Sequence, residues 1–433
     1  MCRFLQKFMV FIIIGAWSFF LWDFDRGLYA AQEGENAVFS GQGVQNERKW
    51  RMEELEEMAL QQNPTIHASR QRVKVLEGRW IQEGVRPNPE IGWMADDMSS
   101  HSGAGKQGFT FSQEIVTGHK LEHAQNVVFQ EIQVAKEDLE SQKLKVITDV
   151  RRAVYRYLTL ERKMRLYEEL DKVTREAYRI AEALYKRGEV SLTDVLSLGV
   201  EAEKLSVLFI TSKNDVSAAW RELACVLGNP EMPPVPLEVK LEMSPVENSW
   251  ETFMETLAQT SPEIRAAAGK IQRAKRNYEL EVAKNSSNVS VEGTVAYSTE
   301  EKVVEAGVGV SIPLRIRDRN QGNIASAGSE VKVAEKEYEQ VLLQVQMRFV
   351  ETYRNFENAR KSVLQYQEKI LPRATQVLEI TKTGYQQGEL GYLDVLSAQQ
   401  QYMTTYIEYI DNLNNYWGSA ALLEGKLLSG CLQ

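Results

Sequence analysis

The sequence contains few of the residues on which disulfide-stabilised and metal-centred folds depend. Among 433 residues there are three cysteines and four histidines. Cys2 precedes an apolar N-terminal stretch, so the rest of the chain can form at most one disulfide, between Cys225 and Cys431. We expect Cys225, near a helix end, to be a small core residue. The counts exclude a disulfide scaffold and a multi-cysteine zinc module, and we expect no cofactor.

Glycine, proline and positive charge are also limited. The 27 glycines and 11 prolines are too few for an all-β sandwich with many tight turns. Lys and Arg number 51 against 60 Asp and Glu, a net charge of −9, which disfavours nucleic acid as a partner. The sequence contains no Gly-rich phosphate loop followed by Lys. We therefore expect no enzyme and no nucleotide site, and energy for any transport would come from a partner.

Residues 1–31 are predicted to be a secretory signal peptide. Basic residues precede an apolar stretch of about 15 residues, Phe8–Trp22, which is short for a membrane helix. Ala30 and Ala31 offer a cleavage point. Acidic residues before that point leave an uncleaved anchor as the alternative. No later stretch approaches about 18 apolar residues, so any further membrane contact must be made by strands or by the surface.

The rest of the chain is duplicated. Tyr185-Lys-Arg-Gly-Glu, continuing to Asp-Val-Leu-Ser197, returns as Tyr385-Gln-Gln-Gly-Glu, continuing to Asp-Val-Leu-Ser397. A period of this length implies two copies of one large unit rather than a solenoid. We predict a first repeat at 50–227, a Pro-rich linker at 228–249 and a second repeat at 250–427.

Each repeat is predicted to contain a long helical hairpin, at about 117–227 and about 320–427. In the second hairpin, apolar residues recur with the heptad spacing of a coiled coil. A helix from Thr117 to Lys186 would be about 100 Å long. Pro372 should kink the second long helix, because it lacks a backbone donor. The predicted apolar seam consists of Val331, Ala334, Tyr338, Val341, Val345, Phe349, Thr352, Phe356, Ala359, Val363, Tyr366, Ile370, Ala374, Val377 and Ile380.

Two short strands precede each hairpin, at about 89–96 and 108–115 and at about 289–298 and 305–312. Val291 and Val295 alternate with polar Glu292 and Thr294, over the length typical of a membrane-barrel strand. A small soluble sheet packed on helices is the alternative. Four strands cannot close a spanning barrel, and open edges are not tolerated in lipid, so a membrane location requires several copies. The predicted lipid-facing residues are Trp93, Phe109, Phe111, Val291, Val295 and Tyr297.

Three further motifs complete the pattern. Arg86-Pro-Asn-Pro-Glu-Ile91 precedes the first strand, and Gln113-Glu-Ile-Val-Thr-Gly-His-Lys120 ends the second. Ser311-Ile-Pro-Leu and then Asp318-Arg-Asn-Gln-Gly-Asn-Ile324 follow the fourth. Together with the two Tyr-x-x-Gly tips, these segments resemble the outer-membrane factor (TolC-like) family. Within that family they are most similar to the cation-efflux (CzcC-like) branch, which serves RND tripartite pumps. The likeness covers 50–427.

The resemblance implies a fold that is mainly α with a small β part. Two long coiled-coil hairpins and four amphipathic strands per chain would contribute to a homotrimer with a 12-stranded outer-membrane β-barrel. It implies a location in the outer membrane with a periplasmic extension, surrounded by outer-membrane lipid. The implied function is a passive exit duct. Resemblance to the cation-efflux branch implies metal cations as its substrates, and drugs or polypeptides are the alternatives. A periplasmic adaptor (membrane fusion) protein and an inner-membrane RND-type pump are the implied partners.

The same resemblance places the hairpin tips at the periplasmic aperture and adaptor contact. The tip residues are Gly188, Glu189, Thr193, Asp194, Gly388, Glu389, Asp394 and Ser397. Asp394 matches a carboxylate that narrows the entrance, and Asp194 one that helps to hold it shut. The family's next carboxylate is replaced by Ser397 and its Arg by Leu390, so we expect the closed state to be held more weakly than in the family. Arg187 or Lys186 could supply the counter-charge. From the residues alone, Gly188 and Gly388 are expected to end one helix, and Asp194 and Asp394 to cap the start of the next.

Two alternatives remain. His119-Lys-Leu-Glu-His123 reads as H-x-x-E-H, a zinc-metallopeptidase signature, with Glu122 as base. The second repeat has Asp318-Arg-Asn-Gln-Gly322 in that place, so the duplicated unit does not need the motif. A periplasmic coiled-coil adaptor or scaffold without a barrel is the other alternative. Such a protein would have one hairpin flanked by β-rich domains, whereas this chain has two equivalent hairpins.

Overall fold

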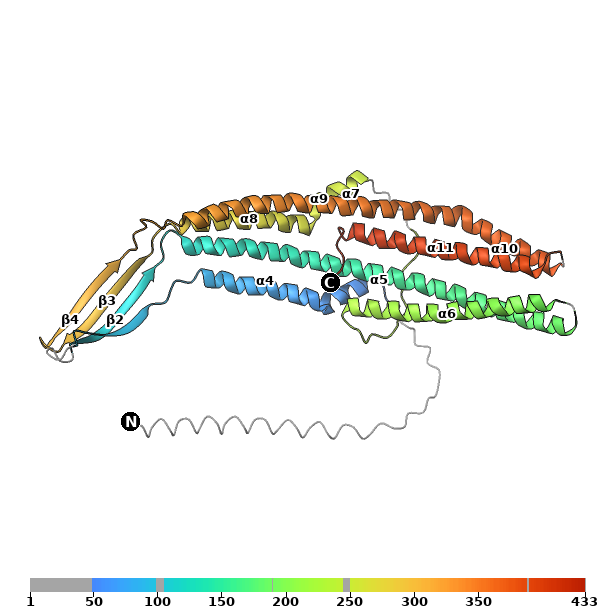
Figure 1. Cartoon of the computed structure of the whole chain (residues 1–433), viewed down its shortest axis with the longest axis horizontal. Coiled ribbons are helices and arrows are strands. Elements are labelled where there is room, and N and C mark those ends of the chain that lie inside the picture. The colour runs from blue at the N-terminus through green and yellow to red at the C-terminus, as the bar shows by residue number, and fades with distance from the viewer. Residues whose placement is uncertain (1–48, 99–104, 189, 244–249, 388, 433) are drawn as a thin grey trace, which may run out of the picture. The chain divides into compact units, whose positions relative to one another are not determined.

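The chain runs through the same order of elements twice: two helices, two strands and a long helical hairpin (Figure 1). The computed structural model describes residues 49–98, 105–188, 190–243, 250–387 and 389–432. The predicted signal peptide 1–31 lies outside these residues, as do Glu189 and Gly388. The first repeat comprises α3 (Met52–Gln62), α4 (Pro64–Glu83), β1 (Glu90–Asp96), β2 (Lys106–Ile115), α5 (Lys120–Lys186) and α6 (Leu192–Leu227). The second comprises α7 (Trp250–Thr260), α8 (Pro262–Ala283), β3 (Val289–Ser298), β4 (Val303–Ser311), α9 (Gln321–Gln365), the π-helical turn η1 (Tyr366–Ile370), α10 (Leu371–Gln386) and α11 (Tyr392–Glu424).

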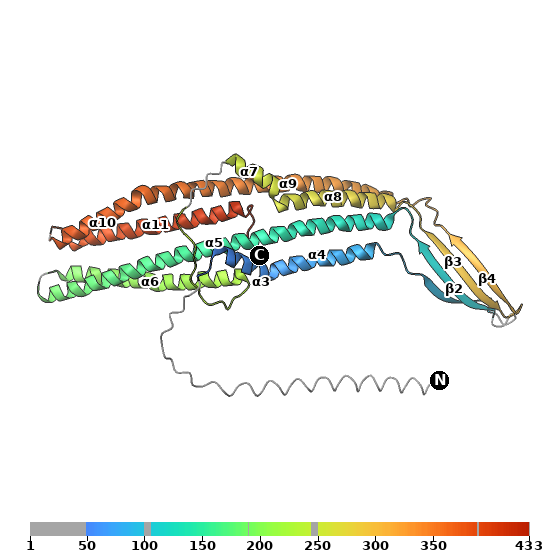
Figure 2. The same ribbon diagram turned by 180° about the vertical axis from the view of Figure 1, so that it is seen from behind.

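The helices lie in a single row along the two hairpins (Figures 1 and 2). In the half next to the tips the order of contacts is α6, α5, α11 and then α9 with α10. In the half next to the sheet it is α4, α5, α8 and α9. α5 runs through both halves, because its 67 residues span about 100 Å. The predicted fold class, mainly helical with a small antiparallel sheet, is confirmed.

The Asn-Pro pair predicted to open a helix does so by capping it. The Asn63 side chain accepts a hydrogen bond from the Thr65 amide at 3.0 Å, and Pro64 occupies the first turn. The fully buried Asn63 also donates to the Val226 carbonyl at 2.9 Å. This second bond joins the start of α4 to the end of α6.

The second hairpin contains a π-helical turn that shifts its apolar seam by one residue. Up to Val363 the predicted seam is buried or half-buried. Beyond it, Ala374 is buried as predicted, but the predicted Ile370, Val377 and Ile380 are exposed and Leu378 is buried instead, so the prediction is wrong at these positions. The π turn contains one residue more than an α turn, which moves the seam from Val377 to Leu378. Pro372 follows directly, in the first turn of α10, so the regular helix is interrupted next to the proline for which a kink was predicted.

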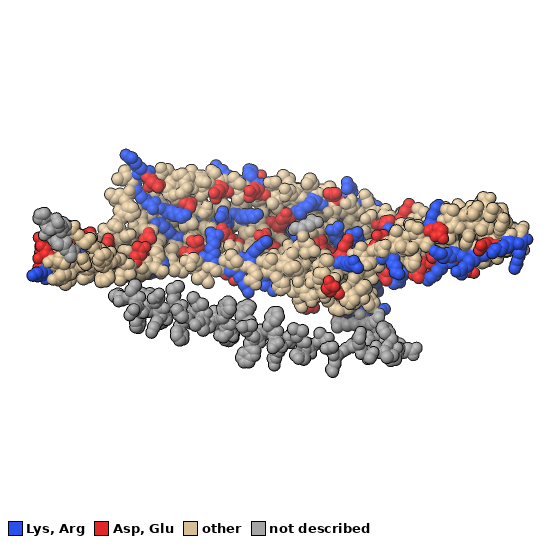
Figure 3. Space-filling view, turned by 60° about the horizontal axis from the view of Figure 1, so that its bottom comes forward, with Lys and Arg blue, Asp and Glu red and all other residues tan. Residues whose placement is uncertain are grey.

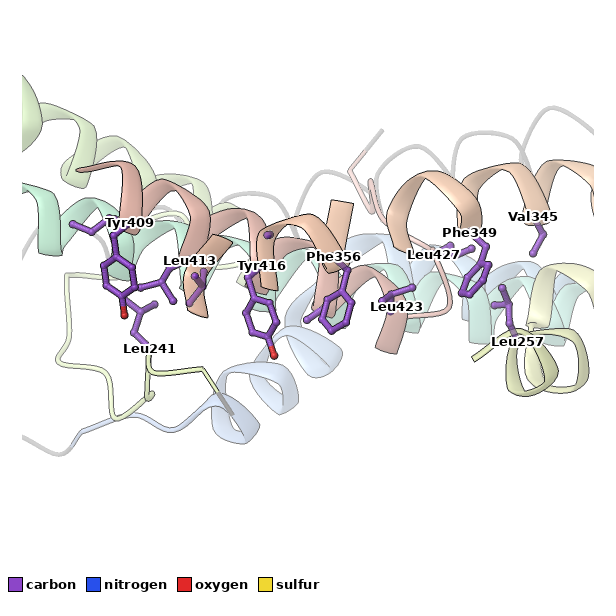
Figure 4. Packing of buried hydrophobic residues seen from close by; sticks show 14 of the residues in the cluster. Leu241, Leu257, Val345, Phe349, Phe356, Tyr409, Leu413, Tyr416, Leu423 and Leu427 are labelled. Atoms are coloured by element: carbon purple, nitrogen blue, oxygen red, sulfur yellow. The ribbon is translucent and has the colours of Figure 1, made fainter. Parts of the chain in front are cut away.

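Aromatic residues fill the interior between α9 and α11 (Figure 4). Phe356 stacks on Tyr416 with ring centroids 5.3 Å apart, and both rings are fully buried. Leu257 from α7 packs against the same cluster beside Phe349. Burying a large side chain of this kind contributes roughly 1.5–3 kcal/mol, so this seam holds the second hairpin together.

The four strands form one antiparallel sheet in the order β1-β2-β3-β4. β2 begins at Lys106, two residues before the predicted start, because Lys106 still pairs with Asp96. β4 begins at Val303 rather than 305, and ends at Ser311 rather than 312. It starts early because Lys302 takes a left-handed conformation, φ 56°, in a turn tight enough for Val303 to pair with Ser298.

Both described cysteines are free thiols. Cys431 is buried, whereas Cys225 is exposed, so the prediction of Cys225 as a core residue is wrong. The buried face of α6 at this end includes Trp220, Leu223, Ala224 and Leu227, whereas Cys225 lies on the exposed side.

Among the residues that the structure describes, no helix has both the length and the apolar character to cross a membrane.

Candidate functional site

One face of the sheet is apolar on all four strands. Residues directly opposite each other on antiparallel strands share a face, and the register places Trp93 opposite Phe109 and Phe109 opposite Val295. Val291 lies opposite Val310 on the same face. The predicted lipid-facing residues Trp93, Phe109, Phe111, Val295 and Tyr297 are 45–63 % exposed, and Val291 is half-buried. A continuous exposed apolar face of this size marks contact with a membrane or a partner.

The opposite face of the sheet is polar and made of small residues. Gly92, Thr110, Thr294 and Gly307 form one row across the four strands. On the same face, the Lys106 ammonium lies 2.8 Å from the Glu305 carboxylate. The sheet thus has the two chemically distinct faces of a membrane strand that borders water on one side.

The sheet is open at both edges within the described part of the chain. β1 and β4 each pair with one neighbour only, so each leaves a row of backbone donors and acceptors without a strand partner. These edges belong to opposite ends of the strand order. A second copy could therefore continue the sheet at either edge.

The row of helices is unpartnered at the same two edges. On α6, exposed apolar residues follow one another at steps of 4, 4, 7 and 3 residues, close to whole helical turns, so they lie on one side of the helix. At the other edge, exposed apolar residues form one group on α9 and a second group on α10, with 26 residues between Val350 and Val377. The α6 stripe consists of Leu192, Leu196, Val200, Val207 and Ile210, and the α9–α10 stripe of Leu343, Met347, Val350, Val377 and Ile380.

These two stripes were not predicted, although the apolar residues of α6 recur close to whole helical turns in the sequence itself. In the second hairpin the stripe is obscured, because the residues predicted for the internal seam at Val377 and Ile380 belong to the outer stripe after the π turn.

The first tip is a short turn between α5 and α6. Gly188 has φ 77°, the left-handed conformation expected of a glycine that ends a helix. The Ser191 hydroxyl caps α6 by accepting from the Asp194 amide at 3.1 Å. Thr193 is exposed and the half-buried Asp194 lies in the first helical turn, where a carboxylate is favourable.

The second tip differs because its acidic residue is itself the cap. The Asp394 carboxylate accepts from the Gly391 amide at 3.0 Å. Asp394, Glu389 and Ser397 are all exposed. Neither Asp194 nor Asp394 forms an ion pair within the described residues. The Lys186 ammonium lies 3.9 Å from the Glu182 carboxylate. Hence neither Arg187 nor Lys186 supplies a counter-charge within one copy.

Polar contacts between α5 and α11 connect the two hairpins. The Arg162 guanidinium donates to the Tyr406 hydroxyl at 2.8 Å and lies 6.0 Å from the ring centroid of Tyr409. Further towards the tips, the Gln399 amide donates to the Thr174 hydroxyl at 3.2 Å. These contacts join residues of different repeats, so no spacing within one repeat could have predicted them.

A hollow of about 740 Å³ lies along α4, α5, α8 and α9. Its lining includes the exposed Val75 and Val333 together with the charged Arg72, Asp138 and Lys270. Burial raises the pKa of Asp138, while Lys270 and Arg72 oppose the shift. The hollow thus combines apolar walls with a carboxylate flanked by cations.

The H-x-x-E-H motif does not form a compact metal site. His119 precedes α5 in a left-handed conformation, φ 52°, and its Nδ1 lies 3.3 Å from the exposed Glu122 carboxylate. His123 lies inside the first turn of α5. Within the described ranges, no group of three His, Cys, Asp or Glu side chains is placed to hold a metal ion.

Comparisons with known proteins agree with this arrangement. The model of the outer membrane efflux protein family matches residues 55–229 and 254–424. The cobalt-zinc-cadmium resistance protein CzcC of Cupriavidus metallidurans is 22 % identical over 367 residues, which are 85 % of this chain and 87 % of CzcC.

Solved structures share the fold. The open state of the MtrE outer membrane channel of Neisseria gonorrhoeae superposes with a TM-score of 0.71 at 16 % identity, covering 90 % of this chain and 94 % of MtrE. The outer membrane protein VceC of Vibrio cholerae superposes with a TM-score of 0.69 at 17 % identity, covering 87 % of this chain and 96 % of VceC.

Proposed function

The chain belongs to the outer membrane efflux protein family, and we propose that three copies of it form a passive exit duct across the outer membrane and the periplasm. As an outer-membrane efflux protein it has a sheet for the membrane and helices that extend into the periplasm. The strands of three copies would close a 12-stranded barrel with the apolar face towards lipid. Trp93, Phe109, Phe111, Val291, Val295 and Tyr297 would contact that lipid.

The observation behind the proposal is that sheet and helices are unpartnered at the same two edges. β1, α4 and α6 form one edge, and β4, α9 and α10 form the other. Joining unlike edges head to tail produces a closed ring when the rotation between copies is suitable. With four antiparallel strands per copy, β4 of one copy also meets β1 of the next in antiparallel orientation. Such a ring leaves no strand edge in lipid.

The mass of the assembly tests the proposal. Purified from membranes in detergent, the protein should have the mass of three chains and should retain its β signal in lipid vesicles. A monodisperse soluble monomer, or a dimer that remains stable in lipid, would contradict a closed three-membered ring.

For the cargo we propose metal cations, delivered by a periplasmic adaptor and an inner-membrane RND-type pump. The similarity to a protein named for cobalt, zinc and cadmium resistance favours this cargo over drugs or polypeptides. An energy-coupled partner is needed because the sequence has no nucleotide-binding loop. Expressed with its cognate pump and adaptor in a sensitised host, the chain should raise tolerance to these three metals. Increased tolerance to hydrophobic drugs alone would favour a different cargo.

At the periplasmic end we propose that the tips form the aperture, with Gly188, Glu189, Thr193, Asp194, Gly388, Glu389, Asp394 and Ser397 at or near the adaptor contact. Three exposed Asp394 carboxylates around the ring axis would favour cation entry. Ser397 and Leu390 provide no further charge there. The latch would therefore be weaker than one held by charge pairs.

The Asp394→Asn variant tests the aperture. Asn also caps helices well, so the fold should persist, while cation preference should fall because the ring loses its charge. Reversal potentials in planar bilayers under a salt gradient measure this preference. Identical values for the two proteins would remove Asp394 from the pore, and Thr193→Ser is a control that keeps the charge.

A further inference from the structure

Beyond β4 the apolar pattern of the sheet continues into a segment of alternating apolar and basic residues, 312–319. Ile312, Leu314 and Ile316 are 53 %, 80 % and 73 % exposed. In the sequence they continue the two-residue spacing of the apolar Val308 and Val310, although the strand itself ends at Ser311. Between them and after them come Arg315, Arg317 and Arg319. The segment lies between the end of β4 and the start of α9, where the sheet gives way to the helices.

Within this segment lies a hollow of about 710 Å³. Its lining includes Leu314 and Ile316 as well as Lys284, Arg315, Arg317 and Asp318. The hollow therefore places exposed apolar side chains and guanidinium groups around one space.

Arg315 is held in place and Arg317 is not. The Arg315 guanidinium donates to the Ser286 carbonyl at 2.6 Å and to the Ser287 hydroxyl at 3.2 Å. The side chain of Arg317 is exposed and has no ion pair within the described part of the chain. A fixed guanidinium beside an unpaired one suits a doubly contacted anionic group.

Nearby acidic groups only partly balance these cations. Glu281 lies 2.7 Å from the Lys284 ammonium and so neutralises it. Asp318 is the remaining carboxylate of the hollow, and it accepts a hydrogen bond from the Asn320 amide at 2.9 Å. Two guanidinium groups thus face one carboxylate.

The surroundings of the hollow are also positive. Burial lowers the pKa of Lys120 at the start of α5, and the Arg315 guanidinium lowers it further, with Glu114 opposing. Lys and Arg side chains gather where the sheet joins the helices, whereas the sheet itself is largely uncharged (Figure 3).

We propose that this hollow binds the head group of an anionic phospholipid in the leaflet nearest the helices, with the acyl chains along Leu314 and Ile316. The proposal rests on the proposed function, because a membrane-spanning barrel places this level of the chain at the lipid head groups. Continuity with the apolar face of the sheet favours a lipid over free phosphate, since inorganic phosphate would leave Leu314 and Ile316 without a role.

Retention of lipid by the purified assembly tests the proposal. The detergent-solubilised protein is mixed with equal amounts of phosphatidylglycerol and phosphatidylcholine of the same acyl chains, and bound lipid is counted by native mass spectrometry. We expect preferential retention of phosphatidylglycerol. Arg317→Gln should reduce it about fivefold, the equivalent of about 1 kcal/mol for one basic residue near an anionic surface.

Lys302→Gln is the matched control, because Lys302 is an exposed cation in the turn at the other end of the sheet. This variant should retain lipid like the wild type. Equal retention of the two lipids by the wild type, or equal loss in both variants, would overturn the proposal. Displacement of phosphatidylglycerol by an excess of inorganic phosphate would also overturn it, in favour of a phosphate site.

The same spectra separate this inference from the assembly on which it rests. A mass of three chains without lipid preference overturns the lipid site alone. A mass of one chain overturns the closed ring and, with it, the lipid site.

Discussion

At the scale of single residues, the two described cysteines differ in reactivity for a physical reason. Burial and, after it, the neighbouring Asp149 carboxylate together raise the pKa of the Cys431 thiol to about 12. Asp149 also accepts hydrogen bonds from the Gly430 amide at 3.1 Å and the Cys431 amide at 2.7 Å, which fixes the C-terminal segment on α5. Cys225 is exposed.

We therefore predict selective labelling of Cys225. At pH 8 a thiol with a pKa of about 12 is ionised to roughly one part in ten thousand, and the thiolate is the reactive form. In a chain with Cys2→Ser, a maleimide should modify one thiol per folded chain and two after denaturation. Adding Cys225→Ser should abolish labelling of the folded protein. Equal rates at both thiols would show that Cys431 is accessible.

The sequence predicted some residue roles and not others. The cap at Asp394 follows from local rules, because a carboxylate three residues after a turn glycine reaches back to its amide. The burial of Cys431 depends on contacts with α5, which lies far away in sequence, so local rules gave no sign of it.

At the scale of the elements, the π turn explains why the second hairpin changes its seam. The chain advances five residues between the half-buried Tyr366 and Leu371, where three or four would continue a coiled coil. Periodicity predicted the seam before the turn, and Pro372 indicated an interruption of the helix near this position. An extra residue in one turn has no sequence signature of its own, so the shifted seam could not be predicted.

We predict that deleting Lys369 converts η1 to an ordinary α turn and leaves both halves of the seam buried. The free energy of unfolding should change by no more than about 1 kcal/mol. Deleting Lys172 from the regular helix α5 is the control, because it rotates all later side chains by about 100°. That deletion should cost at least the roughly 2–5 kcal/mol of one buried Leu. Thermal denaturation of the two proteins compares them, and equal losses would mean that the π turn is needed for the fold.

The face assignment of β3 gives a second prediction at this scale. Val291→Arg places a charge on the face proposed for lipid and should cost roughly 2–4 kcal/mol near the bilayer centre. Thr294→Arg places the same charge on the polar face and should be tolerated. Yield of assembled protein in membranes measures both. Equal losses would contradict the assignment of the two faces.

At the scale of the whole molecule, the duplication could be predicted from the sequence, but the contacts between the repeats could not. The two Tyr-x-x-Gly tips and the repeated strand patterns predict two similar hairpins and four strands. The pairing of β2 with β3 and the contact of Arg162 with Tyr406 join one repeat to the other. Such contacts depend on how the repeats pack, which similarity between them does not specify.

The α6 stripe gives a prediction about assembly. Val207→Lys places a charge on the exposed apolar stripe and should prevent trimer formation, because a lysine at a coiled-coil seam must be desolvated. Asp215→Lys is the control, since this exposed position lies about 100° around α6 from the stripe. Sizes of the two variants in detergent distinguish the outcomes. A trimer of Val207→Lys would place the contact elsewhere.

The two unlike edges also affect inheritance. A closed ring needs both edges of every copy. One copy with a damaged edge therefore prevents two intact copies from closing the ring with it. In a cell that makes equal amounts of intact and α6-damaged chains, random mixing would leave about one eighth of the rings free of damage. Alleles that alter the α6 stripe should therefore be dominant, whereas alleles that abolish synthesis of the chain should be recessive.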